Sequence, residues 1–122
     1  MEGYNNLRET IRQIIIDKGY VLQMEYNNGI YDFNIYDNTT VICNLKIIVT
    51  VGNILIGKTR SSYQNKMEDH DILKILWVFT QPNYRGKQLA LLLIIYSISY
   101  LKIEYPNINY VFFIINRYSI FY

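Results

Sequence analysis

Two cations flank a glycine in the segment T-Q-P-N-Y-R-G-K-Q-L-A, which runs from Thr80 to Ala90 between two apolar stretches. Pro82, Arg85, Gly86 and Lys87 therefore belong to a turn between a strand and a helix, and such a turn does not need two cations. The start of a buried helix leaves N–H groups unpaired and carries partial positive charge. With the cations, and a glycine that lets the backbone approach a ligand, this pattern predicts a phosphate or pyrophosphate site. The alternative, a solvated turn, stays open.

The same segment resembles motif A of the GNAT superfamily of acyl-CoA-dependent N-acyltransferases. The family pattern is Arg or Gln, two residues, Gly, one residue, then Gly or Ala, usually after V-x-P-x-x. The residues 80–82 match V-x-P with Thr for Val, the residues 85–87 match the common R-G-K opening, and Ala90 matches the final small residue. Gln88 stands where the family has its most characteristic glycine, and a side chain there projects towards the path of the pyrophosphate.

The resemblance extends more weakly in both directions. An N-terminal helix, the segment G-N-I-L-I-G (Gly52–Gly57) and a central strand follow in the family's order. The last strand, followed by Asn116, resembles the segment in which an Asn opens the next helix. We therefore expect residues 1–122 to form a single GNAT-like domain that lacks the usual C-terminal strands. Its implied fold is a mixed, mostly antiparallel sheet with flanking helices and a central strand–loop–buried helix–strand unit.

The resemblance implies acetyl-CoA as cosubstrate and no metal. Backbone amides from Arg85 to Ala90 would hold the pyrophosphate, and the amine would attack the thioester directly. Strand amides near residues 78–80 would stabilise the oxyanion. The residues implied to bind the cofactor are Val78, Phe79, Thr80, Arg85, Gly86, Lys87, Gln88, Leu89, Ala90 and Asn116.

A general base is harder to place, because the central strand has no carboxylate between Ile72 and Thr80. The nearest candidates are His70 and Asp71, in the sequence E-D-H-D. The alternative interpretation of this sequence is a solvated acidic loop, which would also attract a cationic amine. One His among carboxylates lacks a convincing spacing for metal ligands, so we expect no metal.

The family's acid, which protonates the departing thiolate, is a tyrosine in the closing helix. Tyr122 corresponds best to that position, and Tyr118 is the second candidate. Trp77, on the central strand, has two interpretations: it lines the acceptor pocket, or it packs in the core.

Periodicity along the chain independently predicts a mixed α/β (α+β) fold. Apolar residues at helical spacing between Leu7 and Ile15 indicate an amphipathic helix that Asn5 or Asn6 caps and Gly19 ends. Turns are expected at residues 27–29, 37–40 and 52–53, and a polar loop at 61–71. The expected strands are Tyr20–Tyr26, Ile30–Tyr36, Val41–Val51, Ile54–Lys58, Ile72–Thr80 and Ile108–Ile115, with a buried helix over Lys87–Glu104.

Composition excludes some classes of protein. The net charge is +2 and the basic residues are scattered, so nucleic acid is not an expected partner. Cys43 is the only cysteine and lies in an apolar strand pattern, which favours a buried thiol and a reducing compartment. The longest apolar stretch, Leu89–Leu101, falls short of the about 20 residues of a membrane span. We expect a cytoplasmic protein, in the host cytoplasm if viral, since residues with AT-rich codons are frequent.

Three functions stay open. The first is an acetyl-CoA-dependent N-acetyltransferase acting on a small-molecule or protein amine. The second is a catalytically degenerate GNAT-like domain that serves as a binding or assembly module, as a homodimer through the C-terminal strand or the buried helix. The third is a protein that binds nucleotides or nucleic acid at the same anion site, with tyrosines stacking on bases.

Overall fold

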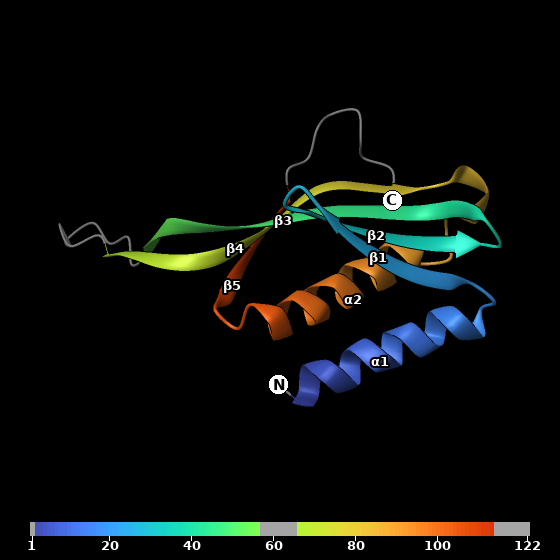
Figure 1. The fold of residues 1–122 in the computed structure, drawn as a ribbon, viewed down its shortest axis with the longest axis horizontal. Helices are drawn as coiled ribbons and strands as arrows, with labels where there is room; N and C mark the ends of the chain where they lie inside the picture. The colour runs from blue at the N-terminus through green and yellow to red at the C-terminus, as the bar shows by residue number, and fades with distance from the viewer. Residues whose placement is uncertain (1, 57–65, 114–122) are drawn as a thin grey trace.

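The computed structural model describes residues 2–56 and 66–113. In the described part of the chain, five strands form one sheet in the order β1-β2-β3-β4-β5. The first four are antiparallel neighbours, and β5 runs parallel to β4 (Figure 1). The elements are α1 (Glu2–Asp17), β1 (Val21–Asn27), β2 (Ile30–Asp37), β3 (Thr40–Ile56), β4 (Lys66–Thr80), a 3-10 turn η1 (Pro82–Tyr84), α2 (Leu89–Glu104) and β5 (Ile108–Phe113). The expected mixed, mostly antiparallel sheet is confirmed.

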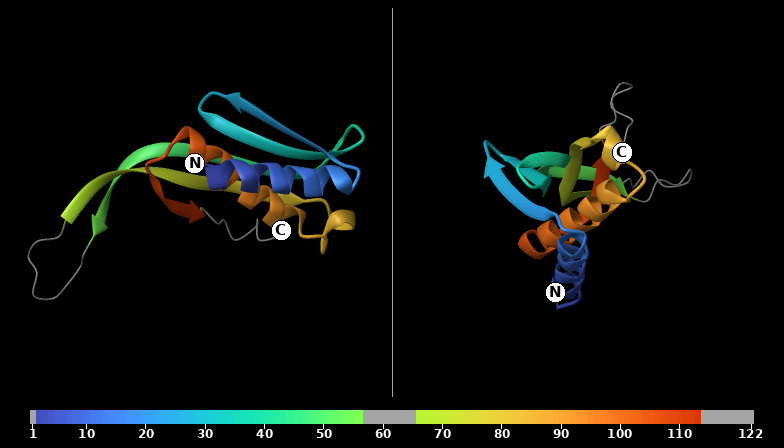
Figure 2. Two further views of the ribbon diagram at one scale, coloured as in Figure 1. Left: turned by 90° about the horizontal axis from the view of Figure 1, so that it is seen from below. Right: turned by 90° about the vertical axis from the view of Figure 1, so that its right-hand side faces the viewer.

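Both helices lie on the same side of the sheet, as Figure 2 shows from below and from the end. α2 packs on β2, β3 and β4, and α1 packs against α2 and β1. The paired ends of β3 and β4 project beyond the other strands as a long two-stranded arm (Figures 1 and 2).

The core lies between the sheet and α2, because alternate residues of each strand face the helices. Phe33 is fully buried there, and its ring meets the rings of Tyr96 and Tyr100 edge-on, at centroid distances of 6.1 and 5.8 Å. α1 contributes Ile11 and Ile15 from its inner face. The other fully buried large side chains of the sheet and α2 are Ile35, Ile42, Leu45, Ile47, Leu73, Leu89, Leu93 and Leu101.

The tight turns follow their sequence signals. Asn28 and Gly29 both have positive φ, 53° and 79°, as the turn between two hairpin strands requires. Asn38, with φ 56°, makes the next turn, and Gly19, with φ 88°, follows the end of α1. These three predictions are confirmed.

The prediction of a turn at residues 52–53 is wrong. β3 continues through Gly52 to Ile56 and pairs with β4 from Cys43 opposite Thr80 to Ile56 opposite Lys66. Three strands, not four, therefore precede the central strand. The continuous ladder of backbone hydrogen bonds overrides the local preference of a Gly-Asn pair for a turn.

The prediction of a loop over residues 61–71 is wrong for residues 66–71. β4 begins at Lys66, so His70 and Asp71 are strand residues, opposite Gly52 and Val51. Pairing with β3 satisfies backbone groups that a loop would leave to water.

The helix limits also differ from those expected. α1 begins at Glu2, so Asn5 and Asn6 lie inside it and cap nothing; the Asn6 carbonyl accepts a hydrogen bond from Thr10 Oγ1 at 2.8 Å. α2 begins at Leu89 and leaves Lys87 in the turn.

One polar contact inside the fold makes stability depend on pH. The hydroxyls of Tyr31 and Tyr105 lie 2.7 Å apart, and burial, followed by this hydrogen bond, raises the pKa of Tyr31 above its ordinary value of 10. A tyrosine with a raised pKa stabilises the fold fully below the pKa of the unfolded chain, and loses that contribution as the pH rises above about 10. We expect the urea midpoint to fall between pH 9 and 11, and to fall less in Tyr31→Phe. The free energy of unfolding should fall by less than about 1 kcal/mol per pH unit, because Tyr31 is partly solvated. An identical pH dependence in both proteins would contradict this.

Candidate functional site

The turn between β4 and α2 is anchored to the sheet at its first residues. Thr80, the last residue of β4, is buried, and its Oγ1 lies 3.4 Å from Cys43 Sγ. Gln81 donates its backbone N–H to the Ile42 carbonyl at 2.8 Å and its side-chain amide to the Val41 carbonyl at 2.7 Å. Burial raises the pKa of Cys43, as expected for a structural thiol.

Tyr84 ties the middle of the turn to the end of β2. Its hydroxyl donates to Asp37 Oδ2 at 2.6 Å, and this hydrogen bond raises the pKa of Tyr84. The ring also meets Tyr20 edge-on, and Lys87 Nζ lies 5.4 Å from the ring centroid. The turn is thus held before any ligand arrives, which lowers the entropy cost of binding.

Two residues of the turn adopt the left-handed conformation, Gly86 with φ 81° and Gln88 with φ 61°. A Cβ added at Gly86 would meet no atom within 4 Å, so the space above this backbone is open. Glycine leaves this space open, whereas the side chain of any other residue would occupy it.

A small open cavity lies at this turn. Its volume is ≈ 140 Å³, well below the roughly 300 Å³ of usual cofactor pockets, which suits a phosphate group and not a whole cofactor. Arg85 donates from Nε to the Thr80 carbonyl at 3.1 Å, which fixes its guanidinium beside the cavity. The cavity is lined by Thr80, Tyr84, Arg85, Gly86, Gln88, Leu89, Ala90 and Leu91.

The start of α2 also faces this cavity. The Leu92 N–H donates to the Gln88 carbonyl at 3.0 Å, so the amides of residues 89–91 precede the first helical hydrogen bond. Free N–H groups and the helix dipole favour an anion at this position. The candidate site therefore combines a cation, an exposed glycine backbone and a helix N-terminus around one cavity.

Gln88 is strained in a way that the sequence did not reveal. It occupies the left-handed region that glycine adopts at no steric cost, and its side chain makes no capping hydrogen bond. We expect Gln88→Gly to raise the free energy of unfolding by up to about 1 kcal/mol, because relief of strain exceeds the added entropy of the unfolded chain. Urea denaturation measures this, with Gln81→Gly as the control. Gln81 has φ −58° and should lose stability instead.

β4 has an irregularity just before the predicted oxyanion residues. Lys46 faces Trp77 and Ile47 faces Ile75, so Leu76 is an extra residue in β4. β5 pairs with β4 only along residues 71–75, and in the described chain residues 76–80 have no partner on that side. Val78 and Thr80 point into the core, and Phe79 is half-buried on the other face.

The structure does not bring the candidate bases to the turn. At about 3.3 Å per residue, Asp71 lies about 30 Å from Thr80 along β4. His70 lies one residue farther, at the root of the arm. Tyr118, Tyr122 and Asn116 lie outside the described residues, and the roles assigned to all five stay predictions.

Trp77 does not pack in the core. It is 41% exposed, on the sheet face opposite the helices, and its ring stacks on Phe79 at 6.1 Å with 23° between the ring planes. The interpretation that Trp77 packs in the core is therefore wrong, and its place in an acceptor pocket stays a prediction.

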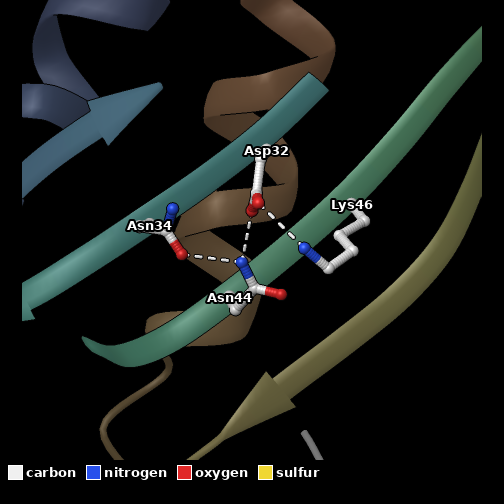
Figure 3. A network of polar contacts seen from close by, with 4 residues as sticks. All are labelled: Asp32, Asn34, Asn44 and Lys46. Carbon is white, nitrogen blue, oxygen red and sulfur yellow. Dashed lines mark hydrogen bonds and ion pairs between the residues drawn. The ribbon is translucent and has the colours of Figure 1, made fainter. Parts of the chain in front are cut away.

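Sequence reasoning missed a polar network on the same face (Figure 3). Asn44 Nδ2 donates to Asp32 Oδ1 at 2.5 Å and to Asn34 Oδ1 at 2.6 Å. Lys46 Nζ lies 2.8 Å from Asp32 Oδ2. The polar residues of β2 alternate in the sequence, but only the register of β2 with β3 brings the four side chains together.

No group of three or more His, Cys, Asp or Glu within the described ranges is placed to hold a metal ion. None of the helices described is long and apolar enough to cross a membrane.

No protein-family model and no curated protein matches the chain, but solved structures match its fold. A predicted acetyltransferase with acetyl-CoA from Clostridium acetobutylicum aligns over 98% of this chain and 79% of its own, at TM-score 0.52 and 17% identity. An aminoglycoside acetyltransferase from an uncultured soil metagenomic sample, solved with sisomicin, aligns over 93% and 74%, at TM-score 0.52 and 12% identity. A transcriptional regulator from Bacillus halodurans aligns at TM-score 0.54 and 13% identity, over 75% of this chain; the chain spans about half (51%) of that protein.

Because these sequence identities are low, the solved structures are evidence for the fold of this chain and not for its function. Acetyltransferases are among the matches, as the resemblance of the β4–α2 turn implied. The chain therefore has the fold of the GNAT N-acetyltransferases.

Proposed function

We propose that this protein is an acetyl-CoA-dependent N-acetyltransferase. The observation that carries the proposal is the cavity between β4 and α2, where Arg85, the exposed backbone of Gly86 and the first amides of α2 converge. The solved structure with acetyl-CoA among its fold neighbours supports this assignment. The left-handed Gln88 supports it too, because glycine adopts this conformation without strain and the family pattern has a glycine at this position.

In the proposed reaction, the turn holds the pyrophosphate of acetyl-CoA through the amides of residues 85–90. The pantetheine arm would lie along the free edge of β4 at residues 76–80. The uncharged acceptor amine attacks the thioester carbonyl, and the strand amides near Val78 stabilise the oxyanion. Collapse of the intermediate transfers the acetyl group to nitrogen and expels the CoA thiolate, which takes up the proton that the amine loses. Tyr122 and Tyr118 remain candidates for the proton donor, and Asp71 and His70 for the base.

The test is release of free CoA thiol from acetyl-CoA in the presence of a panel of amines. Each positive amine should yield its N-acetyl product by mass spectrometry, at a rate proportional to protein concentration. A Gly86→Val variant, which fills the approach to the backbone, should lose the activity. Thiol release at the same rate without any amine would mean hydrolysis and would count against the proposal.

A second candidate function is an assembly module. β5 is the last strand of the described sheet, and Phe112 and Phe113 are 43% and 49% exposed on it. An exposed apolar edge strand favours pairing with a second copy. Sedimentation equilibrium tests this: a dimer that Phe112→Lys dissociates supports an assembly role, and a monomer at all concentrations excludes it.

A further inference from the structure

The arm formed by β3 and β4 has an unpaired strand edge on each side within the described chain (Figures 1 and 2). β2 pairs with β3 no farther than Ile47, so no described strand lies beside residues 48–56 on that side. β5 pairs with β4 only along residues 71–75, so none lies beside residues 66–70 on the other side. A two-stranded ribbon is only marginally stable in water, and the N–H and C=O groups of its edges can pair with a further strand.

The two edges of the arm differ in sequence. The β4 edge has the sequence K-M-E-D-H-D at residues 66–71, with four charged residues among six. Natural sheets use such charges to prevent one edge from pairing with another. The β3 edge, I-V-T-V-G-N-I-L-I at residues 48–56, has no charge and no proline, and six of its nine residues are Ile, Val or Thr. Segments of this kind pair readily with other strands, so the β3 edge is the one suited to a partner.

Val51 on β3 is the most exposed large apolar side chain of the described residues, at 72%. Val49, two residues earlier on the same face of the strand, packs against the core. The segment therefore leaves the body of the protein between these two residues. Burial of an exposed valine against a further strand would stabilise the arm through the hydrophobic effect.

A second copy of the chain matches the β3 edge by symmetry. Two copies of an uncharged strand can pair antiparallel about a two-fold axis without bringing like charges together. Full overlap of residues 48–56 puts Gly52 on the axis and pairs apolar residues with apolar residues, Ile48 with Ile56 and Val49 with Leu55. The combined arm would have four strands, with β4 of each copy outermost. Both outer edges then carry the charges of residues 66–71, so pairing ends at two copies.

We propose that the β3 edge of the arm, residues 48–56, binds the same segment of a second copy of this chain. This dimer does not rest on the proposed acetyl transfer, and it uses an edge other than β5. His70 faces Gly52, and Thr80, where the anion site begins, lies about 33 Å farther along β4. The anion sites of the two copies would therefore be far apart, and dimerisation should leave acetyl-CoA affinity unchanged.

Sedimentation equilibrium from about 1 to about 100 µM measures the association. The unmodified protein should form a reversible dimer. Val51→Lys should weaken dimerisation at least about tenfold, because two lysines would then lie close together near the axis. Val51→Thr keeps an uncharged β-branched residue and should still dimerise. Val21→Lys, the same change at a 47% exposed valine on β1, is the matched control and should dimerise normally.

Hydrogen exchange locates the contact. Amides of residues 48–56 should exchange more slowly as the protein concentration rises through the dimerisation range, while those of β2 should not change. Full protection of residues 48–56 in dilute, monomeric protein would mean that other parts of the same chain cover this edge, and would overturn the proposal. A monomer at all concentrations would also overturn it, as would a dimer that Phe112→Lys dissociates and Val51→Lys does not.

Calorimetry with acetyl-CoA separates this proposal from the proposed function. The unmodified protein and Val51→Lys should bind acetyl-CoA with the same affinity. If neither binds acetyl-CoA but Val51→Lys alone loses the dimer, the proposed function fails and the dimer stands. If both bind it and both are monomers, the dimer proposal fails and the proposed function stands.

Discussion

Arg85→Glu should weaken acetyl-CoA binding by more than about 100-fold, which corresponds to about 2.7 kcal/mol. The substitution removes a cation beside the cavity and places a carboxylate against the pyrophosphate, so a charge-assisted hydrogen bond is lost and repulsion is added. Isothermal titration calorimetry measures the affinity.

The control for this prediction is Arg12→Glu, the same charge reversal on the exposed side of α1. It should leave the affinity unchanged. Because Arg85 also holds the Thr80 carbonyl, thermal unfolding of both variants is needed to show that the turn survives. Undiminished affinity in a folded Arg85→Glu protein would show that the cofactor does not use this cavity.

Phe33→Ala should lower the free energy of unfolding by about 3–5 kcal/mol, a large part of the roughly 5–15 kcal/mol of a typical domain. Phe33 is fully buried, and its ring holds α2 on the sheet through Tyr96 and Tyr100. Since α2 supplies one wall of the cavity, acetyl-CoA affinity should fall with stability.

Phe33→Leu is the graded control, because it keeps an apolar side chain in the core. It should cost less than half as much as Phe33→Ala in urea denaturation. Equal losses in the two variants would mean that the space around Phe33 collapses freely, and that its edge-on ring contacts do not hold α2.

Local signals in the sequence predicted local structure well. Asn28 and Gly29 form their turn because both residues tolerate positive φ. In β2, apolar and polar residues alternate in the sequence, and the apolar residues Phe33 and Ile35 belong to the core. The Gly-Asn pair at residues 52–53 gave an equally good turn signal, yet β3 runs through it. Only the pairing with a distant strand decides between these outcomes, and that pairing is not visible in a local pattern.

The candidate site also combines features that could be predicted from the sequence with features that only the structure shows. Arg85 and Gly86 are adjacent in the sequence, so their position at one cavity could be predicted from the helix that follows, whereas Lys87 does not line that cavity and lies over the ring of Tyr84. The left-handed conformation of Gln88 could not, because glutamine rarely adopts it. Asp32 and Asn44 meet only through the register of two strands, so their hydrogen bond could not be predicted from the sequence.

The most direct test of the central claim is a calorimetric titration of the unmodified protein with acetyl-CoA, repeated in excess pyrophosphate. We predict one site per chain with micromolar affinity, about −8 kcal/mol, and competition by pyrophosphate. No heat of binding at millimolar acetyl-CoA would contradict the account, because the cavity between β4 and α2 would then hold no cofactor.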